Sequence, residues 1–207
     1  MVESLVEGGS VESENGYVLL ELGCGSRPLP FRASGNFRGD NYYIGVDLPR
    51  HLQEEVYSQS KWGLPNDGLK KCVERIESLD PEEQKRIGLL EADMFLGLPI
   101  GDHAVDEVYL SNVLSDPRIF YDDNSSANFV TLFCEIRRVL KVEGRLTVFT
   151  SYDPLYEKQV KQLLDENGFR IEQQYSARNP KDLEFMRRYN RDVYYGEGAY
   201  LLSAVPV

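Results

Sequence analysis

The chain has little histidine, little cysteine and a deficit of basic side chains. Its 207 residues include two His and three Cys, and 23 Lys and Arg stand against 34 Asp and Glu, which gives a formal net charge of -11. The cysteines are widely spaced without a pattern, which argues against a disulfide framework or a zinc site and is typical of a reducing cytoplasm. Because this much negative charge repels a phosphate backbone, it also argues against a nucleic acid partner.

Long apolar runs are also lacking. No run approaches the length of about 20 residues that crosses a bilayer. The N-terminus opens with Met1-Val2-Glu3-Ser4 and has no basic, apolar-cored signal, so we expect no membrane association. Residues 1–16 carry four Glu and no Lys or Arg. They predict a flexible acidic lead-in to a single domain at 17–207.

Short apolar segments alternate with amphipathic ones along the rest of the chain. The apolar segments predict strands at 17–22, 42–48, 88–92, 105–110, 145–150, 169–175 and 199–205. The spacing of apolar residues between them predicts helices at 50–60, 67–79, 127–140, 154–166 and 182–191. Such alternation predicts a parallel sheet with helices on both faces, and in such sheets a ligand lies beyond the carboxyl ends of the strands.

Residues with recognisable chemistry follow each of the first three predicted strands. The first strand ends in Glu21-Leu22-Gly23-Cys24-Gly25, where glycines allow a tight turn and the close approach of a ligand. The second ends at Asp47, whose carboxylate can accept hydrogen bonds from both hydroxyls of a ribose. Asp93, beside Met94 and Phe95, follows the third strand. A carboxylate there can accept a hydrogen bond from the amine of an adenine, and the apolar neighbours can pack on its ring faces. Each is also explained by an ordinary turn or loop acid, but together they have the order of a nucleoside site.

In this order the motifs resemble those of class I S-adenosylmethionine-dependent methyltransferases, over residues 17–205. The resemblance implies a three-layer Rossmann-like α/β sandwich whose seven-stranded, mostly parallel sheet has an antiparallel closing strand. It also implies S-adenosyl-L-methionine as cofactor and in-line methyl transfer to a small molecule or a protein side chain. The strings that carry it are Val18-Leu19-Leu20-Glu21-Leu22-Gly23-Cys24-Gly25, Tyr43-Ile44-Gly45-Val46-Asp47, Glu91-Ala92-Asp93, and Glu135-Ile136-Arg137-Arg138-Val139-Leu140-Lys141 with Gly144-Arg145-Leu146.

By this resemblance the turn Gly23-Cys24-Gly25 passes under the methionine part of the cofactor, and Glu21 holds its amino group directly or through water. The sequence departs from the family where a third glycine is common, because Arg27 stands there and Pro28 follows. Arg27 is a candidate partner for the cofactor's carboxylate. Two Pro and two Gly within 26–41 disfavour the regular helix that usually follows the turn.

The remaining cofactor contacts implied by the resemblance come from the ends of the next strands. Asp47 accepts hydrogen bonds from the ribose hydroxyls, and Leu48 beside it is also a cofactor-binding residue by the resemblance. Asp93 faces the adenine amine, and Met94 supplies backbone contact and packing. Ser111, at the end of the fourth strand, lies beside the methionyl group.

Candidate catalytic groups are fewer. The resemblance places Asn112 near the transferred methyl, and Asp116, just past the fourth strand, is the best-placed candidate base. The more ordinary interpretation of an acid before Pro117 is a turn or a helix cap. His103 enters the fourth strand at the opposite edge, and His51 lies on the ribose side, so neither is well placed as a base. We expect no metal site.

The connection at 176–198, between the last two strands, is unusually long. One interpretation is a wall or lid for a small-molecule substrate; the other is a solvated insertion whose short helix packs partly as core. Two other function classes stay open. A nicotinamide-dependent oxidoreductase requires a pyrophosphate cradle at a helix N-terminus, which this glycine turn lacks. A non-catalytic cofactor- or partner-binding module of the same fold requires no base.

Overall fold

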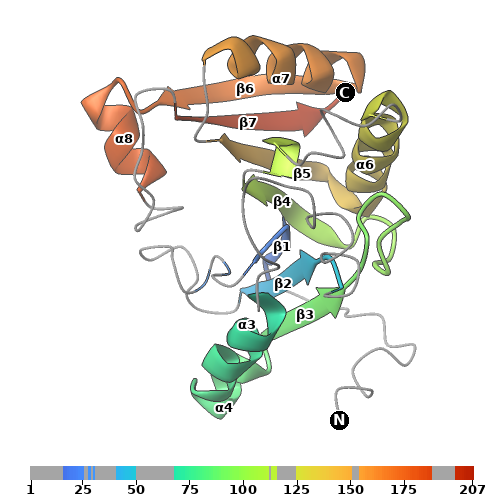
Figure 1. Ribbon diagram of the computed structural model, residues 1–207, viewed down its shortest axis with the longest axis vertical. Coiled ribbons are helices and arrows are strands. Elements are labelled where there is room, and N and C mark those ends of the chain that lie inside the picture. Colours follow the sequence, from blue (N-terminus) through green and yellow to red (C-terminus); the bar gives the residue numbers. More distant parts are fainter. Residues whose placement is uncertain are drawn as a thin grey trace, which may run out of the picture.

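Seven strands form a single sheet in the part of the chain that the computed structural model describes, residues 16–25, 28, 30, 41–49, 68–111, 113–115, 125–150, 154–187 and 199–207. Their order across the sheet is β3-β2-β1-β4-β5-β7-β6 (Figure 1). The strands are β1 (Val18–Leu22), β2 (Tyr42–Asp47), β3 (Ile87–Glu91), β4 (Val105–Ser111), β5 (Leu140–Thr150), β6 (Phe169–Ser176) and β7 (Tyr200–Pro206).

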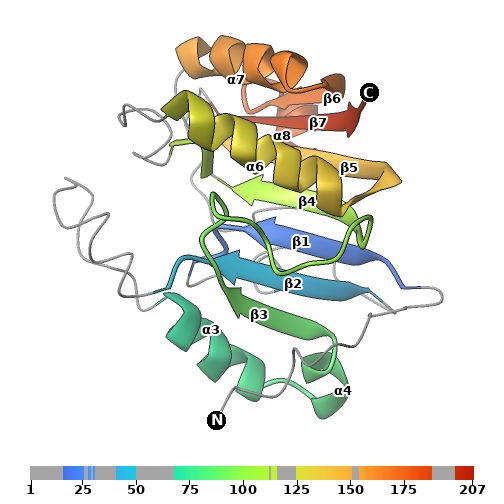
Figure 2. The same cartoon turned by 90° about the vertical axis from the view of Figure 1, so that its right-hand side faces the viewer.

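The strand directions confirm the predicted fold class. β1 pairs in parallel with both β2 and β4, and the β2–β3 and β4–β5 pairs are parallel as well. β7 is antiparallel to both β5 and β6, and in Figure 2 its arrow runs opposite to those of β1, β2 and β4. The chain order reverses between β1 and β4, so the carboxyl ends of these two strands flank the topological switch point where α/β sheets bind ligands.

Alternation of side chains across the strands gives the sheet an apolar surface on each face. On one face, α6 (Ser125–Val139) and α7 (Pro154–Glu166) cover a core that includes Leu20, Leu22 and Phe133. On the other face, α8 (Pro180–Met186) buries Met186 against a second cluster with Leu19. Figure 2 shows α6 in front of the sheet, α7 above β6 at the top, and α8 behind the strands.

Short helices flank the β3 edge. α3 (Gly68–Glu77) lies between β2 and β3 in the sequence, and α4 (Pro81–Gln84) follows it. Asp80 caps α4 by accepting a hydrogen bond from the Glu82 N–H at 2.9 Å, with Pro81 at the first helical position, as the sequence predicts. Within the described ranges, no helix is long and apolar enough to cross a membrane.

Most predicted boundaries agree with the structure to within two residues, and those of β5 and α8 differ more. β5 begins at Leu140, five residues before the predicted strand, because Leu140 pairs with Val105. Where a turn before Arg145 was expected, the β4–β5 pairing shows a register shift instead. α8 begins two residues earlier than predicted, at Pro180 after the N-cap Asn179, and ends at Met186, five residues before the predicted end. The helix predicted at 50–60 lies outside the described residues. So does most of 26–41, although Pro30 within it is helical.

Candidate functional site

The turn after β1 requires glycine at two positions. Gly23 and Gly25 have φ angles of 72° and 58°, in the left-handed region that residues with a Cβ rarely adopt. A Cβ added at Gly23 would lie 2.7 Å from Cγ2 of Val113, which follows β4. The N–H groups of Gly23 and Cys24 donate to the Val46 carbonyl at 2.8 and 3.1 Å. Thus the turn is packed against β2 on one side and against the segment after β4 on the other.

Asp47 connects this turn to the end of β2. Its Oδ2 accepts a hydrogen bond from the Gly25 N–H at 2.8 Å, and its Oδ1 accepts one from the Leu48 N–H at 2.8 Å. Its carbonyl accepts from the Ala92 N–H at 3.0 Å, which adds the end of β3 to the same group. Each carboxylate oxygen has two lone pairs, so a carboxylate held in this way can also accept hydrogen bonds from a diol.

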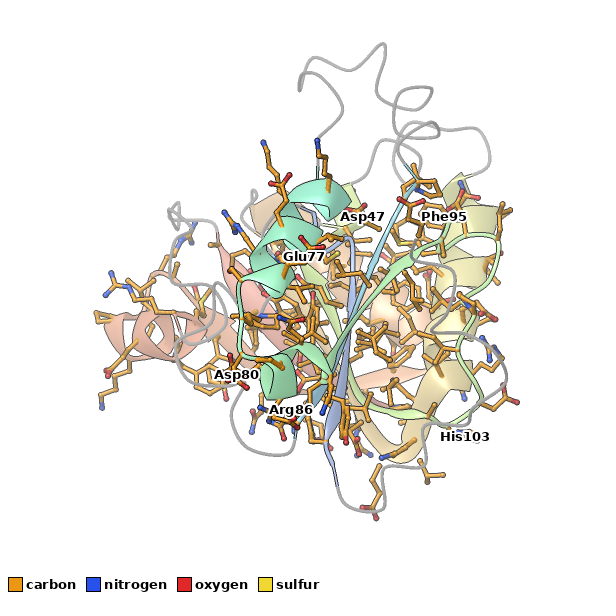
Figure 3. All side chains as sticks on the ribbon, turned by 90° about the horizontal axis from the view of Figure 1, so that it is seen from below. Asp47, Glu77, Asp80, Arg86, Phe95 and His103 are labelled. Carbon is orange, nitrogen blue, oxygen red and sulfur yellow. The ribbon has the colours of Figure 1, made fainter. Side chains whose placement is uncertain are left out.

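The loop after β3 continues the same edge of the sheet. Asp93 turns the chain by accepting the Phe95 N–H at Oδ1 (3.1 Å) and the Leu96 N–H at its carbonyl (2.9 Å). Met94 and Phe95 are buried in the core, as packing residues in the predicted adenine contact would be. In Figure 3, Asp47 and Phe95 lie toward the same end of the molecule. The structure therefore places the first three predicted motifs along one edge.

Arg138, on α6, anchors the rest of this loop. Its guanidinium donates to the carbonyls of Ile100 (2.7 Å) and Leu98 (3.0 Å) and forms ion pairs with Asp102 and Glu135, each at 2.7 Å. Glu135 in turn accepts the Leu98 N–H at 2.8 Å. These hydrogen bonds fix the loop that follows Asp93 against α6, so Arg138 stabilises the predicted adenine side of the candidate site from outside it.

Replacing Arg138 with alanine is expected to lower the free energy of unfolding by about 2–4 kcal/mol, because the carboxylate of Glu135 and two carbonyls lose a charged donor in a partly buried place. Urea denaturation measures the change. Arg170→Ala is the matched control: Arg170 pairs with Glu172, and their side chains are 65% and 47% exposed. It should cost less than about 1 kcal/mol. Equal losses in the two variants would contradict this role for Arg138.

The same ion pair makes part of the stability depend on pH. The hydrogen bond from Arg138 is the main cause that lowers the pKa of Glu135 below its ordinary value of 4.5. Because the folded-state pKa is the lower one, the stabilisation is complete above pH 4.5 and is lost as the pH falls through the folded-state pKa. Glu135→Gln should therefore be most destabilising near neutral pH, with a difference from the wild type that shrinks in acid. In an Arg138→Ala background, urea titrations should show most of that pH dependence gone; an unchanged dependence would contradict the assignment.

Glu21 and Ser111 occupy the ends of the two central strands. Glu21 is fully buried and accepts a hydrogen bond from the Tyr43 hydroxyl at Oε2, at 2.5 Å. Ser111 is half-buried and pairs with Phe149 across the β4–β5 ladder. The candidate catalytic residues Asn112 and Asp116 lie outside the described residues, as do Arg27 and His51.

The connection between β6 and β7 is described as far as residue 187. Its helix α8 packs as core: Met186 is fully buried, and the Phe185 ring stacks on Tyr175 with centroids 4.1 Å apart. In this part the structure favours the packed insertion over a lid, whereas residues 188–198 lie outside the described part. His103 lies at the end opposite Asp47 (Figure 3), where Leu140 O is 2.8 Å from its Nδ1, as expected of a structural histidine. Among the side chains described, no group of three or more His, Cys, Asp or Glu could hold a metal ion.

Two residues beside the site escaped the sequence analysis. Cys72 on α3 is fully buried, and its thiol donates to the Gly25 carbonyl at 2.9 Å. Tyr43 is fully buried and binds Glu21. The apolar face of the predicted helix at 67–79 was the available signal for Cys72. For Tyr43 the sequence offers none, because a tyrosine in a buried strand is ordinary.

Comparison with known proteins supports the fold alone. No protein-family model and no curated protein matches the sequence. Solved structures do match, among them a SAM-dependent methyltransferase from Aquifex aeolicus, with 12% identity, a TM-score of 0.55, and coverage of 92% of this chain and 82% of that one. The glycopeptide N-methyltransferase MtfA matches with 14% identity, a TM-score of 0.61, and coverage of 92% and 83%. Geranyl diphosphate C-methyltransferase from Streptomyces coelicolor A3(2) matches with 15% identity, a TM-score of 0.55, and coverage of 92% and 74%.

The fold is therefore that of class I S-adenosylmethionine-dependent methyltransferases. MtfA has been crystallised with S-adenosylmethionine and with S-adenosylhomocysteine. The activities of these matched proteins include N- and C-methylation, so the fold accommodates chemically different acceptors.

Proposed function

We propose that this protein binds S-adenosyl-L-methionine and transfers its methyl group to a small molecule or a protein side chain. The observation that carries the proposal is the hydrogen bond between Asp47 Oδ2 and the Gly25 N–H at 2.8 Å, at the end of β1 beside the switch point. It joins a turn that has two glycines, and therefore no side chains at those positions, to a carboxylate that suits a ribose diol. When bound, the cofactor supplies a methyl group activated by a sulfonium.

The residues at this edge fit such a ligand. The turn Gly23-Cys24-Gly25 lets a ligand approach the backbone, as its left-handed glycines allow. Asp47 accepts the ribose hydroxyls in the proposal, and Leu48 fixes its orientation through the N–H at 2.8 Å. In the proposal, Asp93 and Met94 contact the adenine. In the proposal, Glu21 and Ser111 lie beside the methionine part of the cofactor.

The acceptor side of the proposal involves fewer groups. Methyl transfer is an in-line displacement, so the main tasks of the protein are to position the acceptor and to exclude water. We assign Asn112 to the methyl region and Asp116 to the role of base for an acceptor that must lose a proton. Separate substitutions of Asn112 and Asp116 test these roles. Each variant should still bind the cofactor but should lose turnover.

Calorimetric titration with S-adenosylmethionine and S-adenosylhomocysteine tests the proposed cofactor, with NADH as the control nucleotide. We expect dissociation constants of about 1–100 μM for both sulfur compounds and no binding of NADH. A folded protein that binds neither sulfur compound would overturn the proposal, and binding of NADH alone would support the oxidoreductase. Binding without turnover across a panel of amine, hydroxyl and thiol acceptors would favour a non-catalytic module.

A further inference from the structure

Two free thiols meet beneath the candidate cofactor turn. Cys24 belongs to the turn after β1 and Cys72 to α3, and they are 3% and 0% exposed. The Cys72 thiol donates to the Gly25 carbonyl at 2.9 Å, which places it beside Cys24, the residue that precedes Gly25 in the turn. The glycine turn and a helix distant in sequence are thus joined through their cysteines.

Half of the α3 residues whose burial is described, those at 70–77, are exposed. Lys70, Lys71, Glu74 and Glu77 are exposed, and Cys72 is the one fully buried side chain described on this helix. An element with so little buried apolar surface opens locally at a low free energy. Opening of α3 would expose both sulfurs together.

We propose that Cys24 and Cys72 form a reversible disulfide that weakens cofactor binding, an inference that rests on the proposed function. In the forward step each thiol loses one proton and one electron, an S–S bond forms, and a peroxide oxidant is reduced to two molecules of water. A dithiol reductant reverses the step by thiol–disulfide exchange through a mixed disulfide.

The expected loss of affinity follows from the contacts of the turn. A disulfide brings its two sulfurs to about 2.05 Å, closer than any non-bonded approach, so Cys24 must move relative to α3. The Gly25 carbonyl also loses the hydrogen that it receives from Cys72. Gly25 is the residue whose N–H orients Asp47. A shift of the turn therefore displaces the proposed ribose acceptor, and we expect about a tenfold weaker affinity, the scale of one hydrogen bond.

The closed structure protects the pair from oxidation. The hydrogen bond with Cys72, followed by burial and the nearby Asp47, raises the pKa of Cys24 well above its ordinary value. Because the thiolate is the reactive form, oxidation must proceed through the open state of α3. A bound cofactor holds the turn in place, so it should slow disulfide formation. Slower disulfide formation in the presence of cofactor would show that the disulfide and cofactor binding are linked, which mere closeness of two cysteines would not produce.

The experiment treats the full chain with hydrogen peroxide and follows disulfide formation by peptide mapping and S-adenosylmethionine affinity by calorimetry. In the wild type we expect a crosslinked peptide containing Cys24 and Cys72, about a tenfold loss of affinity, and recovery with dithiothreitol. Bound S-adenosylhomocysteine should slow the crosslink. Cys134 is exposed and lies on α6, so Cys134→Ser is the control that should respond like the wild type. Cys72→Ser, which retains a hydroxyl donor, should not respond.

Each result decides the proposal. Oxidation of Cys134 without any Cys24–Cys72 crosslink would overturn it, and so would a crosslink that leaves the affinity unchanged. If the reduced protein binds no S-adenosylmethionine, the proposed function fails. Peptide mapping of the wild type then still shows whether the disulfide forms, so the two failures are distinguishable, and no variant has to fold for that readout.

Discussion

Asp47→Ala is expected to weaken S-adenosylmethionine binding by about 100-fold or more. The variant removes a carboxylate that two backbone N–H groups, those of Gly25 and Leu48, hold at the end of β2. Two charge-assisted hydrogen bonds to the ribose hydroxyls would be lost, each worth about 1.5–3 kcal/mol. Calorimetric titration of the purified variant measures the change, and circular dichroism establishes that it is folded.

Glu91→Ala is the matched control for this prediction. Glu91 is the exposed last residue of β3 and pairs with Asp47 across the β2–β3 ladder, so the control removes the same charge from the same edge. Its affinity for S-adenosylmethionine should stay within about twofold of the wild type, since an exposed charge outside the pocket contributes little. If both variants bind equally well, the site lies elsewhere.

Gly23→Ala is expected to destabilise the fold by about 2–4 kcal/mol and to abolish cofactor binding. The residue has a φ of 72°, and a Cβ there would lie 2.7 Å from Cγ2 of Val113. Because Gly23 and Cys24 share the Val46 carbonyl as acceptor, the turn cannot relieve the clash without losing backbone hydrogen bonds. Urea denaturation monitored by circular dichroism gives the change in unfolding free energy.

Gly101→Ala provides the comparison for this change. A Cβ at Gly101 meets nothing within 4 Å, so the same substitution should change the unfolding free energy by less than about 1 kcal/mol. A Gly23→Ala protein as stable as the Gly101→Ala protein would show that the turn tolerates a side chain. The proposed close approach of a ligand would then lose its main structural reason.

The strands were the most predictable part of the fold. Val18–Leu22 is apolar apart from Glu21 and is followed at once by glycine, and Tyr42–Asp47 ends just before Pro49, so local composition marks both ends. The start of β5 was not predictable, because Leu140 joins the strand only through its pairing with Val105, far away in the sequence. The predicted order of motifs along one edge was confirmed by the parallel pairing of β1 with β2 and of β2 with β3.

The sequence by itself determined the alternation of strands and helices and the residue types at three strand ends, because these depend on neighbours a few positions away. Only the tertiary structure decided what those residues touch. The hydrogen bond of Asp47 to Gly25 and that of Cys72 to the same glycine depend on the order of β1, β2 and α3 in space. Packing of whole apolar faces sets that order, and no local pattern encodes which buried thiol or tyrosine will meet the turn.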